Sequence, residues 1–404
     1  MNPFEKVYCR TVQGALRAAS PVLPYRNPMT LDGIAQLPHV LHRKQIDSVL
    51  LVTDQGIRGI GLTNGLETML HHEHIRCIVY DKTVANPTSQ NVEEARELYL
   101  KENCQAIIGF GGGSSIDCAK AVGARIAKPH QSLKQMGGVL KVHKILPLLI
   151  AVPTTAGTGS EVTVAAVITD SETHHKYAIT DFCLIPHFAI LDPELTRSLP
   201  PDITACTAMD ALTHAIEAFI GRSTFPESRK DALEAVRLIF ANLDKAYQNG
   251  DDLQARRRLL RASYLAGRAF SRSYVGYVHA VAHSLSGKYN LPHGYTNAVL
   301  LPWVLEAYGP SIDDRLAQIA VAADVADSTD APEKAAAALI EAIRGMNRRF
   351  GIPTGFKELR REDIPELART ASKEGNPLYP VPVLMSHTEL ESLYALVLEE
   401  NDEA

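Results

Sequence analysis

Short apolar runs alternate with helix-like segments through the first half of this 404-residue chain. Runs rich in β-branched and other apolar residues indicate five strands, at residues 48–54, 76–81, 104–113, 148–155 and 187–195. Between them, residues 92–103 and 115–127 carry the pattern of helices. Strands that alternate with helices predict a parallel sheet with both faces covered.

After Ser198–Pro201 the pattern changes, and apolar residues recur at helical spacing only. Helices are predicted over residues 203–220, 228–247, 253–270, 315–326 and 333–353. The last of these ends at Gly351 and Pro353, which is a normal exit from a helix. We therefore predict an α/β domain over residues 1–199 and an all-helical domain over residues 200–404.

Composition and charge limit the partners of the chain. A formal net charge of −5 and the lack of a basic domain point away from nucleic acid. The longest apolar run, Ile145–Pro153, is far shorter than the roughly 20 residues that span a bilayer, and the first residues lack a signal-peptide core. Six scattered cysteines without a CxxC pair indicate reduced thiols. We expect a soluble cytoplasmic protein without a membrane partner.

Two loops of small residues follow predicted strands. The sequence GGGSSIDCAK (Gly111–Lys120) follows the third strand and opens a helix, where glycines and free N–H groups suit a pyrophosphate. PTTAGTGSE (Pro153–Glu161) follows the fourth strand. Loops at the carboxyl ends of parallel strands are expected to face one ligand crevice. The first loop is not GxGxxG, and a tight strand–helix turn is the alternative interpretation.

Asp54 stands at the end of the first predicted strand. Its carboxylate could accept hydrogen bonds from a ribose diol, and it would repel a 2′-phosphate. The position therefore favours NAD over NADP. The alternative is an aspartate that caps a helix or closes a turn.

Histidines gather in one short stretch, since His279, His283 and His293 all lie within residues 276–294. Asp210 and His214 stand four residues apart in a predicted helix, so both side chains reach one point. Asp210, His214 and His279, with one or both of the other histidines, make a nitrogen and oxygen set. Such a set suits a divalent iron or zinc ion with an open position. Hydrogen-bonded core residues are the alternative for either group alone.

The chain resembles the iron-containing (group III) alcohol dehydrogenase family over nearly its whole length. Gly111–Ser114, Asp117 and Ala119–Lys120 fit the family pattern GGGSxxDxAK. Ala189–Glu217 resembles one family signature, and Gly276–Thr296 resembles a second. The resemblance implies a dehydroquinate synthase-like fold: a parallel-sheet dinucleotide-binding domain followed by an all-helical domain that holds metal and substrate.

The resemblance also implies a role for each matching residue. The implied metal ligands are Asp210, His214, His279 and His293. His283 is implied to lie near the substrate without binding the metal, and Phe270 to form a wall of the substrate pocket. The implied cofactor contacts are Asp54, Asn86, Gly112, Gly113, Ser114, Asp117, Thr154, Thr155, Thr158 and Lys176.

This resemblance implies an enzyme that moves a hydride between a short primary alcohol, or a diol, and NAD. Fe(II), or Zn(II) in its place, would act as the Lewis acid, and His283 would relay the proton to solvent. A homodimer or larger homo-oligomer is expected. The alternatives are a glycerol dehydrogenase-like or other enzyme of the dehydroquinate synthase superfamily, and a non-catalytic protein that binds NAD and metal.

Overall fold

The computed structural model describes residues 1–173 and 175–399. Two compact units are present. The sheet unit contains Pro24–Leu199 and Gly250–Leu260, and the helical unit contains Met1–Leu23, Pro200–Asn249 and the chain from Arg261 onward. Among the described residues, no helix has the length and apolar character needed to cross a membrane.

Six parallel strands form the main sheet of the sheet unit, in the order β1-β9-β6-β4-β2-β3. These strands are β1 (Met29–Leu31), β2 (Ser48–Val52), β3 (Arg76–Tyr80), β4 (Ala106–Gly111), β6 (Leu148–Pro153) and β9 (Phe188–Ile190). The predicted parallel sheet is confirmed, and its five predicted strands correspond to β2, β3, β4, β6 and β9. The last strand is shorter than predicted, because Asp192 caps a 3-10 helix that begins at Pro193.

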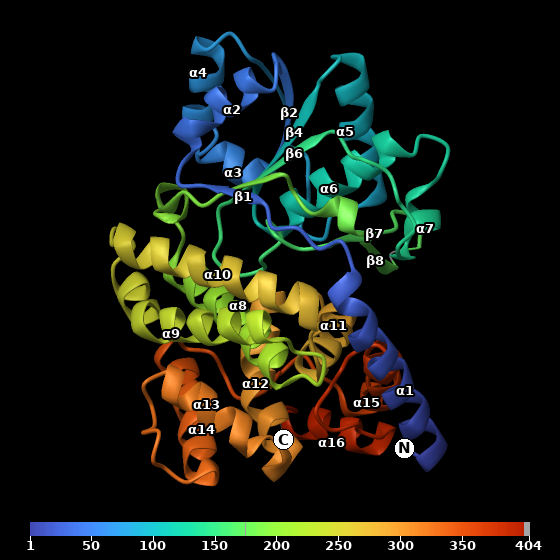
Figure 1. The fold of residues 1–404 in the computed structure, drawn as a ribbon, viewed down its shortest axis with the longest axis vertical. Coiled ribbons are helices and arrows are strands. Elements are labelled where there is room, and N and C mark those ends of the chain that lie inside the picture. The colour runs from blue at the N-terminus through green and yellow to red at the C-terminus, as the bar shows by residue number, and fades with distance from the viewer. Residues whose placement is uncertain (174, 400–404) are drawn as a thin grey trace. The chain divides into compact units, whose positions relative to one another are not determined.

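The central strand β2 is buried along its whole length, and its side chains alternate between two hydrophobic cores. Leu50 and Val52 point into one core, and Val49 and Leu51 point into the other. Helices cover both faces (Figure 1): α5 (Ser89–Lys101) and α6 (Gly113–Ala127) on one, α2 (Leu37–Arg43) and α4 (Asn64–His72) on the other. Burial on both faces explains why this strand is a continuous apolar run.

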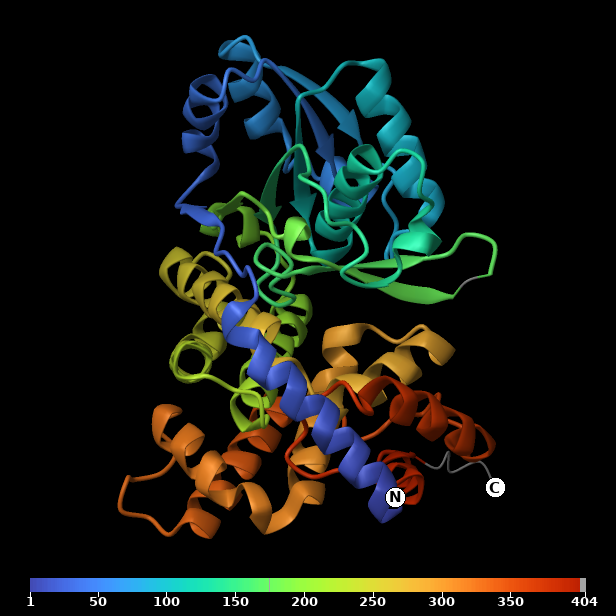
Figure 2. The ribbon, with the colours of Figure 1, turned by 45° about the vertical axis from the view of Figure 1, so that its right-hand side comes forward.

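A second sheet and the N-terminal helix were not predicted from the sequence. The small sheet has the order β5 (Gly138–Val139), β8 (Lys176–Thr180), β7 (Ala165–Thr169), and its last two strands form an antiparallel pair (Figure 2). β8 is mostly half-buried and the two residues of β5 are exposed, whereas β7 is a short apolar run (Ala165–Ile168) that was not recognised as a strand. Helix α1 (Pro3–Ala19) begins at Asn2, whose side chain forms a capping box with Glu5.

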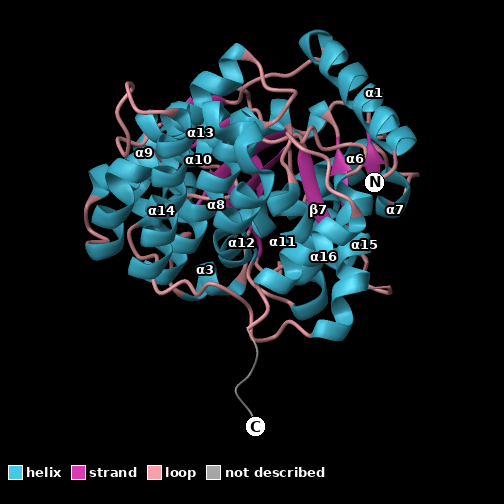
Figure 3. Cartoon of the chain, turned by 90° about the horizontal axis from the view of Figure 1, so that it is seen from below, coloured by secondary structure: helices cyan, strands magenta, loops and turns pink. Residues whose placement is uncertain are grey.

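Helices build the described part of the helical unit, which contains no named strand (Figure 3). After α1 they are α8 (Pro201–Ile220), α9 (Pro226–Gln248), the later part of α10 (Leu253–Ser273), α11 (Tyr277–Tyr289), α12 (His293–Tyr308), α13 (Asp313–Ala322), α14 (Pro332–Arg349), α15 (Ile364–Gly375) and α16 (His387–Leu396). The five predicted helices correspond to α8, α9, α10, α13 and α14. The exit at Gly351 is confirmed by its φ of +68°.

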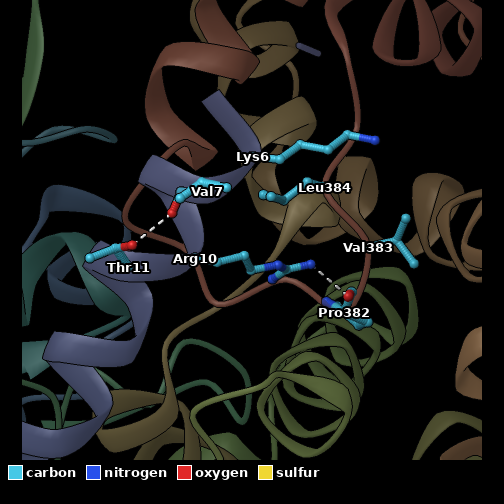
Figure 4. Close-up of a pocket in the computed structure, with 7 residues that line it drawn as sticks. All are labelled: Lys6, Val7, Arg10, Thr11, Pro382, Val383 and Leu384. Carbon is cyan, nitrogen blue, oxygen red and sulfur yellow. Dashed lines mark hydrogen bonds between the residues drawn. The ribbon is translucent and has the colours of Figure 1, made fainter. Parts of the chain in front are cut away.

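Helix α1 is bound to a later segment of the same unit. The guanidinium of Arg10 donates to the carbonyl oxygens of Val381 at 2.7 Å and Pro382 at 2.8 Å. Figure 4 shows the pocket beside this contact, lined by Lys6, Val7, Arg10, Thr11, Pro382, Val383 and Leu384. The Arg10 guanidinium is hydrogen-bonded to carbonyl oxygens of the same chain. No residue of the predicted metal set lines this pocket.

The packing of α6 against β4 depends on Gly109. A Cβ atom there would lie 2.9 Å from the Cβ of Ala119 and 3.0 Å from the Cα of Ile116. We therefore expect Gly109→Ala to lower the free energy of unfolding by about 1–3 kcal/mol through overpacking. Urea denaturation measures the loss. Gly59→Ala, where a Cβ meets open space, is the control and should leave stability nearly unchanged; equal stability of both variants would contradict the packing argument.

Candidate metal centre

Helix α8 presents Asp210 and His214 on one face, four residues apart. It begins with Pro201 in its first turn, where the missing N–H costs no helical hydrogen bond. Asp210 is 2 % exposed and His214 is 4 % exposed. A carboxylate and an imidazole this deeply buried require a partner of opposite charge or a donor.

Helices α11 and α12 supply the other two histidines. His279 lies in the first turn of α11 and is buried. The helix ends at Asn290, whose left-handed backbone (φ 54°) reverses the chain within a few residues. His293 is then the first residue of α12, directly after Pro292. This short connection packs the start of α12 against α11, so that the His293 ring lies beside the His279 ring.

The structure brings the four predicted ligands together. One ligand atom from each of Asp210, His214, His279 and His293 lies within 4.8 Å of the other three. Asp210 Oδ1 is 3.5 Å from His293 Nε2 and 3.9 Å from His279 Nε2, and its Oδ2 is 3.9 Å from His214 Nδ1. Within the described residues, this is the one group of three or more histidine, cysteine or acidic side chains so arranged.

The chemistry of this cluster fits a divalent metal ion. It offers one carboxylate oxygen and three imidazole nitrogens without a thiol, a donor set suited to Fe(II) or Zn(II). Burial, together with the neighbouring imidazoles, lowers the pKa of His279 well below its usual value. The ring is therefore neutral and keeps a lone pair for coordination.

Glu217 belongs to this centre and was not singled out from the sequence. Its Oε2 lies 2.5 Å from His279 Nδ1, and its Oε1 accepts a hydrogen bond from the Val278 N–H at 2.8 Å. A carboxylate behind a metal-binding histidine fixes the ring and raises its basicity. The available signal was spacing, since Glu217 follows His214 by three residues and shares its helix face.

Aromatic rings surround the cluster. Phe270, on α10, stacks on His214 with ring centroids 4.2 Å apart and planes 15° apart. His283 stacks on His293 with centroids 5.1 Å apart. The Nδ1 of His283 is 2.5 Å from Glu374 Oε1. The two residues assigned by resemblance to the substrate side thus each contact the ring of a predicted ligand.

In the sheet unit, the predicted cofactor loops follow neighbouring strands. The chain passes from β2 outward to β3 and then returns to β4 on the other side of β2, so the order reverses between β2 and β4. Ligands of open parallel sheets bind at such a reversal. The glycine loop follows β4, and the Thr154 N–H donates to the Gly111 carbonyl oxygen at 3.0 Å, which joins it to the loop after β6.

Asp54 follows β2 and caps the short helix α3 (Gln55–Gly59). Its Oδ1 accepts a hydrogen bond from the Ile57 N–H at 2.9 Å, and its Oδ2 accepts one from the Ser115 hydroxyl at 3.3 Å. The capping alternative raised by the sequence is thus present. The same carboxylate also stands beside the start of α6, where the glycine loop ends.

The glycine loop lies close to other residues of the predicted cofactor set. A Cβ on Gly113 would come within 2.9 Å of the Thr158 methyl carbon, and one on Gly112 within 3.8 Å of Thr155. Such close approach explains the glycines. Helix α6 starts at Gly112 without a side-chain cap, so its first N–H groups are available to an anion.

Asn86, Ser114 and Lys176 form a connected group in the same unit. Lys176 Nζ donates to Asn86 Oδ1 at 2.9 Å, and the Asn86 N–H donates to the Ser114 hydroxyl at 3.3 Å. Asn86 adopts a left-handed backbone with φ of 58°. Three residues that are far apart in sequence, and that were all assigned to the cofactor by resemblance, are therefore neighbours.

Two residues of the predicted cofactor set make contacts inside the fold. Thr154 is only 1 % exposed, so its side chain lies in the interior of the sheet unit. Asp117 Oδ2 accepts a hydrogen bond from the Val167 N–H of β7 at 2.9 Å, and burial raises the pKa of Asp117. The Asp117 hydrogen bond ties α6 to the small sheet.

The helical unit holds a largely buried cluster of one aspartate and three histidines, and the sheet unit holds two anion-suited loops at the reversal point of its parallel sheet. These are the features of a metal-dependent dehydrogenase. Comparison with known families agrees. The model of the iron-containing alcohol dehydrogenases matches residues 29–193, and the model of the C-terminal part of Fe-containing alcohol dehydrogenases matches residues 204–398. The chain belongs to the iron-containing alcohol dehydrogenase family, whose cofactors are iron and NAD(H).

Individual relatives cover most of the chain. It is 40 % identical to the 1,3-propanediol dehydrogenase of Citrobacter freundii, over 81 % of this chain and 85 % of the relative. It is 37 % identical to the NAD-dependent methanol dehydrogenase of Bacillus methanolicus, over 82 % of this chain and 88 % of the relative. The crystal structure of a 1,3-propanediol oxidoreductase superposes with a TM-score of 0.89 at 34 % identity, covering 93 % of this chain and 99 % of that one.

Removal of the metal should destabilise the helical unit. A metal that binds only the folded state adds about 4 kcal/mol at 1,000 times its dissociation constant. Chelator treatment should therefore lower the Tm, and Fe(II) or Zn(II) should restore it. His279→Ala should lose this response, whereas His71→Ala, at the exposed end of α4, should keep it. A metal response that survives in His279→Ala would contradict the site.

Glu217→Gln should weaken metal binding. The amide cannot accept from His279 as a carboxylate does, and loss of such a supporting carboxylate costs about 10- to 100-fold in metal affinity or activity. Competition with a chromogenic chelator measures the affinity for Zn(II). Glu374→Gln is the matched control. Glu374 is also acidic, but its hydrogen bonds are with His283 and Tyr379 and not with any of the four ligands. Equal Zn(II) affinities of the two variants would show that Glu217 does not support the metal site.

Proposed function

We propose that this chain catalyses reversible hydride transfer between a short primary alcohol, or a diol, and NAD. The observation that carries the proposal is the convergence on one point of Asp210, His214 and His279, which are buried, and His293, which is partly exposed. Family membership assigns the reaction class, which favours this function over the glycerol dehydrogenase-like, lyase and non-catalytic alternatives. The named relatives, a propanediol and a methanol dehydrogenase, support a small hydroxylated substrate.

Each unit supplies one requirement of the reaction. We assign the dinucleotide to the sheet unit, which holds most of residues 1–199, through the predicted set from Asp54 to Lys176, and the metal and substrate to the helical unit, which holds most of residues 200–404. When bound, the ion supplies Lewis-acid polarisation of the substrate oxygen, and NAD supplies the hydride acceptor. The four ligands hold the ion, and Phe270, stacked on His214, forms an apolar wall for the substrate carbon chain.

His283 is the proposed proton-handling residue. Its Nδ1 is 2.5 Å from Glu374 Oε1, and Glu374 also accepts a hydrogen bond from the Tyr379 hydroxyl at 2.7 Å. This arrangement leaves the Nε2 of His283 as the nitrogen that takes or gives the substrate proton. The His283 side chain is 41 % exposed, so the proton has a path to solvent.

The proposal includes a cytoplasmic homo-oligomer. All six cysteines lie in the described part of the chain as free thiols, which supports a reducing compartment. Phe4, Val7 and Tyr8 on α1 are 88 %, 67 % and 62 % exposed, and exposed apolar surface of this kind supports association of copies.

A metal-resolved activity screen tests the function. Chelator-stripped protein receives Fe(II) under anaerobic conditions, or Zn(II), and NADH absorbance is followed with a panel of short aldehydes, alcohols and diols. We expect turnover that depends on the metal, disappears in His279→Ala and falls strongly in His283→Ala. NAD binding without metal-dependent turnover on any of these compounds would reject the dehydrogenase and favour the lyase or non-catalytic alternatives.

Asp54→Asn should relax the preference for NAD. Asparagine keeps the capping oxygen for the Ile57 N–H but removes the charge that would repel a 2′-phosphate. The ratio of kcat/KM with NADPH to that with NADH should therefore rise while the Tm stays nearly unchanged. Asp54→Ala, which also loses the cap, should relax the preference but lower the Tm. An unchanged cofactor ratio in both variants would show that Asp54 only caps α3.

A further inference from the structure

Asn297 stands at the metal cluster although it is not one of its four predicted ligands. It follows His293 by four residues on α12, so both side chains project from the same face of that helix. Its side chain is fully buried, at 0 % exposure. A buried amide needs partners for two N–H protons and for one carbonyl oxygen.

The amide nitrogen of Asn297 faces three acceptors. Its Nδ2 is 2.7 Å from Asp210 Oδ1, 3.1 Å from His293 Nε2 and 3.2 Å from His279 Nε2. An NH2 group has only two protons, so it cannot satisfy all three lone pairs at once. The contact with Asp210 is the shortest, and a donor bound to a carboxylate makes a stronger hydrogen bond than one bound to a neutral ring.

The carbonyl oxygen of Asn297 differs from its amide nitrogen in having no partner within the described chain. Oδ1 is buried and has no hydrogen-bond partner among the described residues. The side chain thus leaves its own acceptor unsatisfied while its nitrogen faces the cluster. What sets this asparagine apart is that its nitrogen faces ligand atoms of the metal cluster.

We propose that Asn297 is a positioning residue of the metal centre: its amide holds Asp210 Oδ1 by a hydrogen bond and so fixes the carboxylate in its ligating orientation. This inference rests on the proposed metal site and adds a residue to it. A bound ion would use the lone pairs of His279 and His293, and Asp210 would then be the acceptor left for the amide. An asparagine does this without adding charge, whereas a second carboxylate would repel Asp210 and weaken the positive charge that the ion presents to the substrate.

The test measures the affinity of the metal-free protein for Zn(II), by competition with a chromogenic chelator and without NAD or substrate. Asn297→Leu, which is similar in size and has no amide, should bind Zn(II) about 10- to 100-fold more weakly. Asn297→Ala serves as the second variant, so that a folding failure of the leucine variant does not decide the outcome. Circular dichroism establishes that each variant is folded before titration.

Asn347→Leu is the matched control. Asn347, on α14, is also a buried asparagine whose Nδ2 makes one hydrogen bond, to the Ala298 carbonyl oxygen at 2.7 Å, and whose Oδ1 has no partner among the described residues. Its substitution should lower the Tm but leave Zn(II) affinity unchanged. Wild-type affinity in both folded Asn297 variants would overturn the proposal.

Absorption of the Co(II)-loaded protein separates a positioning residue from a direct ligand. If Asn297 only orients Asp210, the visible bands of the leucine variant shift in position, but their intensity does not increase. A large increase in intensity, as expected when a five-coordinate ion loses a ligand, would overturn the positioning role in favour of coordination through Oδ1. Because affinity and spectrum are measured without turnover, they can succeed or fail independently of the proposed dehydrogenase activity.

Discussion

Four lone-pair donors, three of them on buried side chains, converge on one point of the helical unit, and only a cation satisfies them together. Asp210 brings a negative charge with almost no contact to water, and the three imidazoles bring acceptors rather than a balancing charge. Burial of an uncompensated carboxylate is among the more expensive arrangements in a protein. The centre is therefore costly to the fold without its ion, and the surrounding residues are arranged to limit that cost.

Helix geometry does most of this arranging. Spacing of four residues on α8 places Asp210 beside His214, and three further residues bring Glu217 behind His279. The left-handed turn at Asn290 returns His293 to the cluster. Gly276 is required at the start of α11, because a Cβ there would stand 2.7 Å from Glu217 Oε1. The helices thus set the positions of the four ligands, and a second layer of side chains, such as Glu217, holds the ligand side chains in orientation.

The sequence predicted those features that depend on period and on local spacing. The strands of the main sheet are continuous apolar runs because they are buried on both faces, and the ligand pairs share helix faces. The roles of Glu217 and Asn297 depend on side chains that are 62 and 87 residues away in sequence, so spacing within one helix did not assign them. The pair β7–β8 was not predicted: β8 is mostly half-buried, and the short apolar run of β7 was not recognised as a strand.

Asp54 shows how two interpretations of one residue can both be useful. The sequence left open a ribose contact or a helix cap, and the structure shows the cap while leaving the second carboxylate oxygen beside the glycine loop. Thr154 shows the opposite limit: the sequence places it in a cofactor loop, but only the fold reveals that its side chain is buried. Exposure is decided by packing between distant elements, which a single sequence does not display.

The most direct measurement is anomalous diffraction at the iron edge from crystals of the protein loaded with Fe(II). The account predicts one strong peak within coordination distance of Asp210, His214, His279 and His293, and loss of that peak in His279→Ala crystals. An active, iron-loaded protein with no anomalous peak among these four side chains, or with its peak elsewhere, would contradict the central claim.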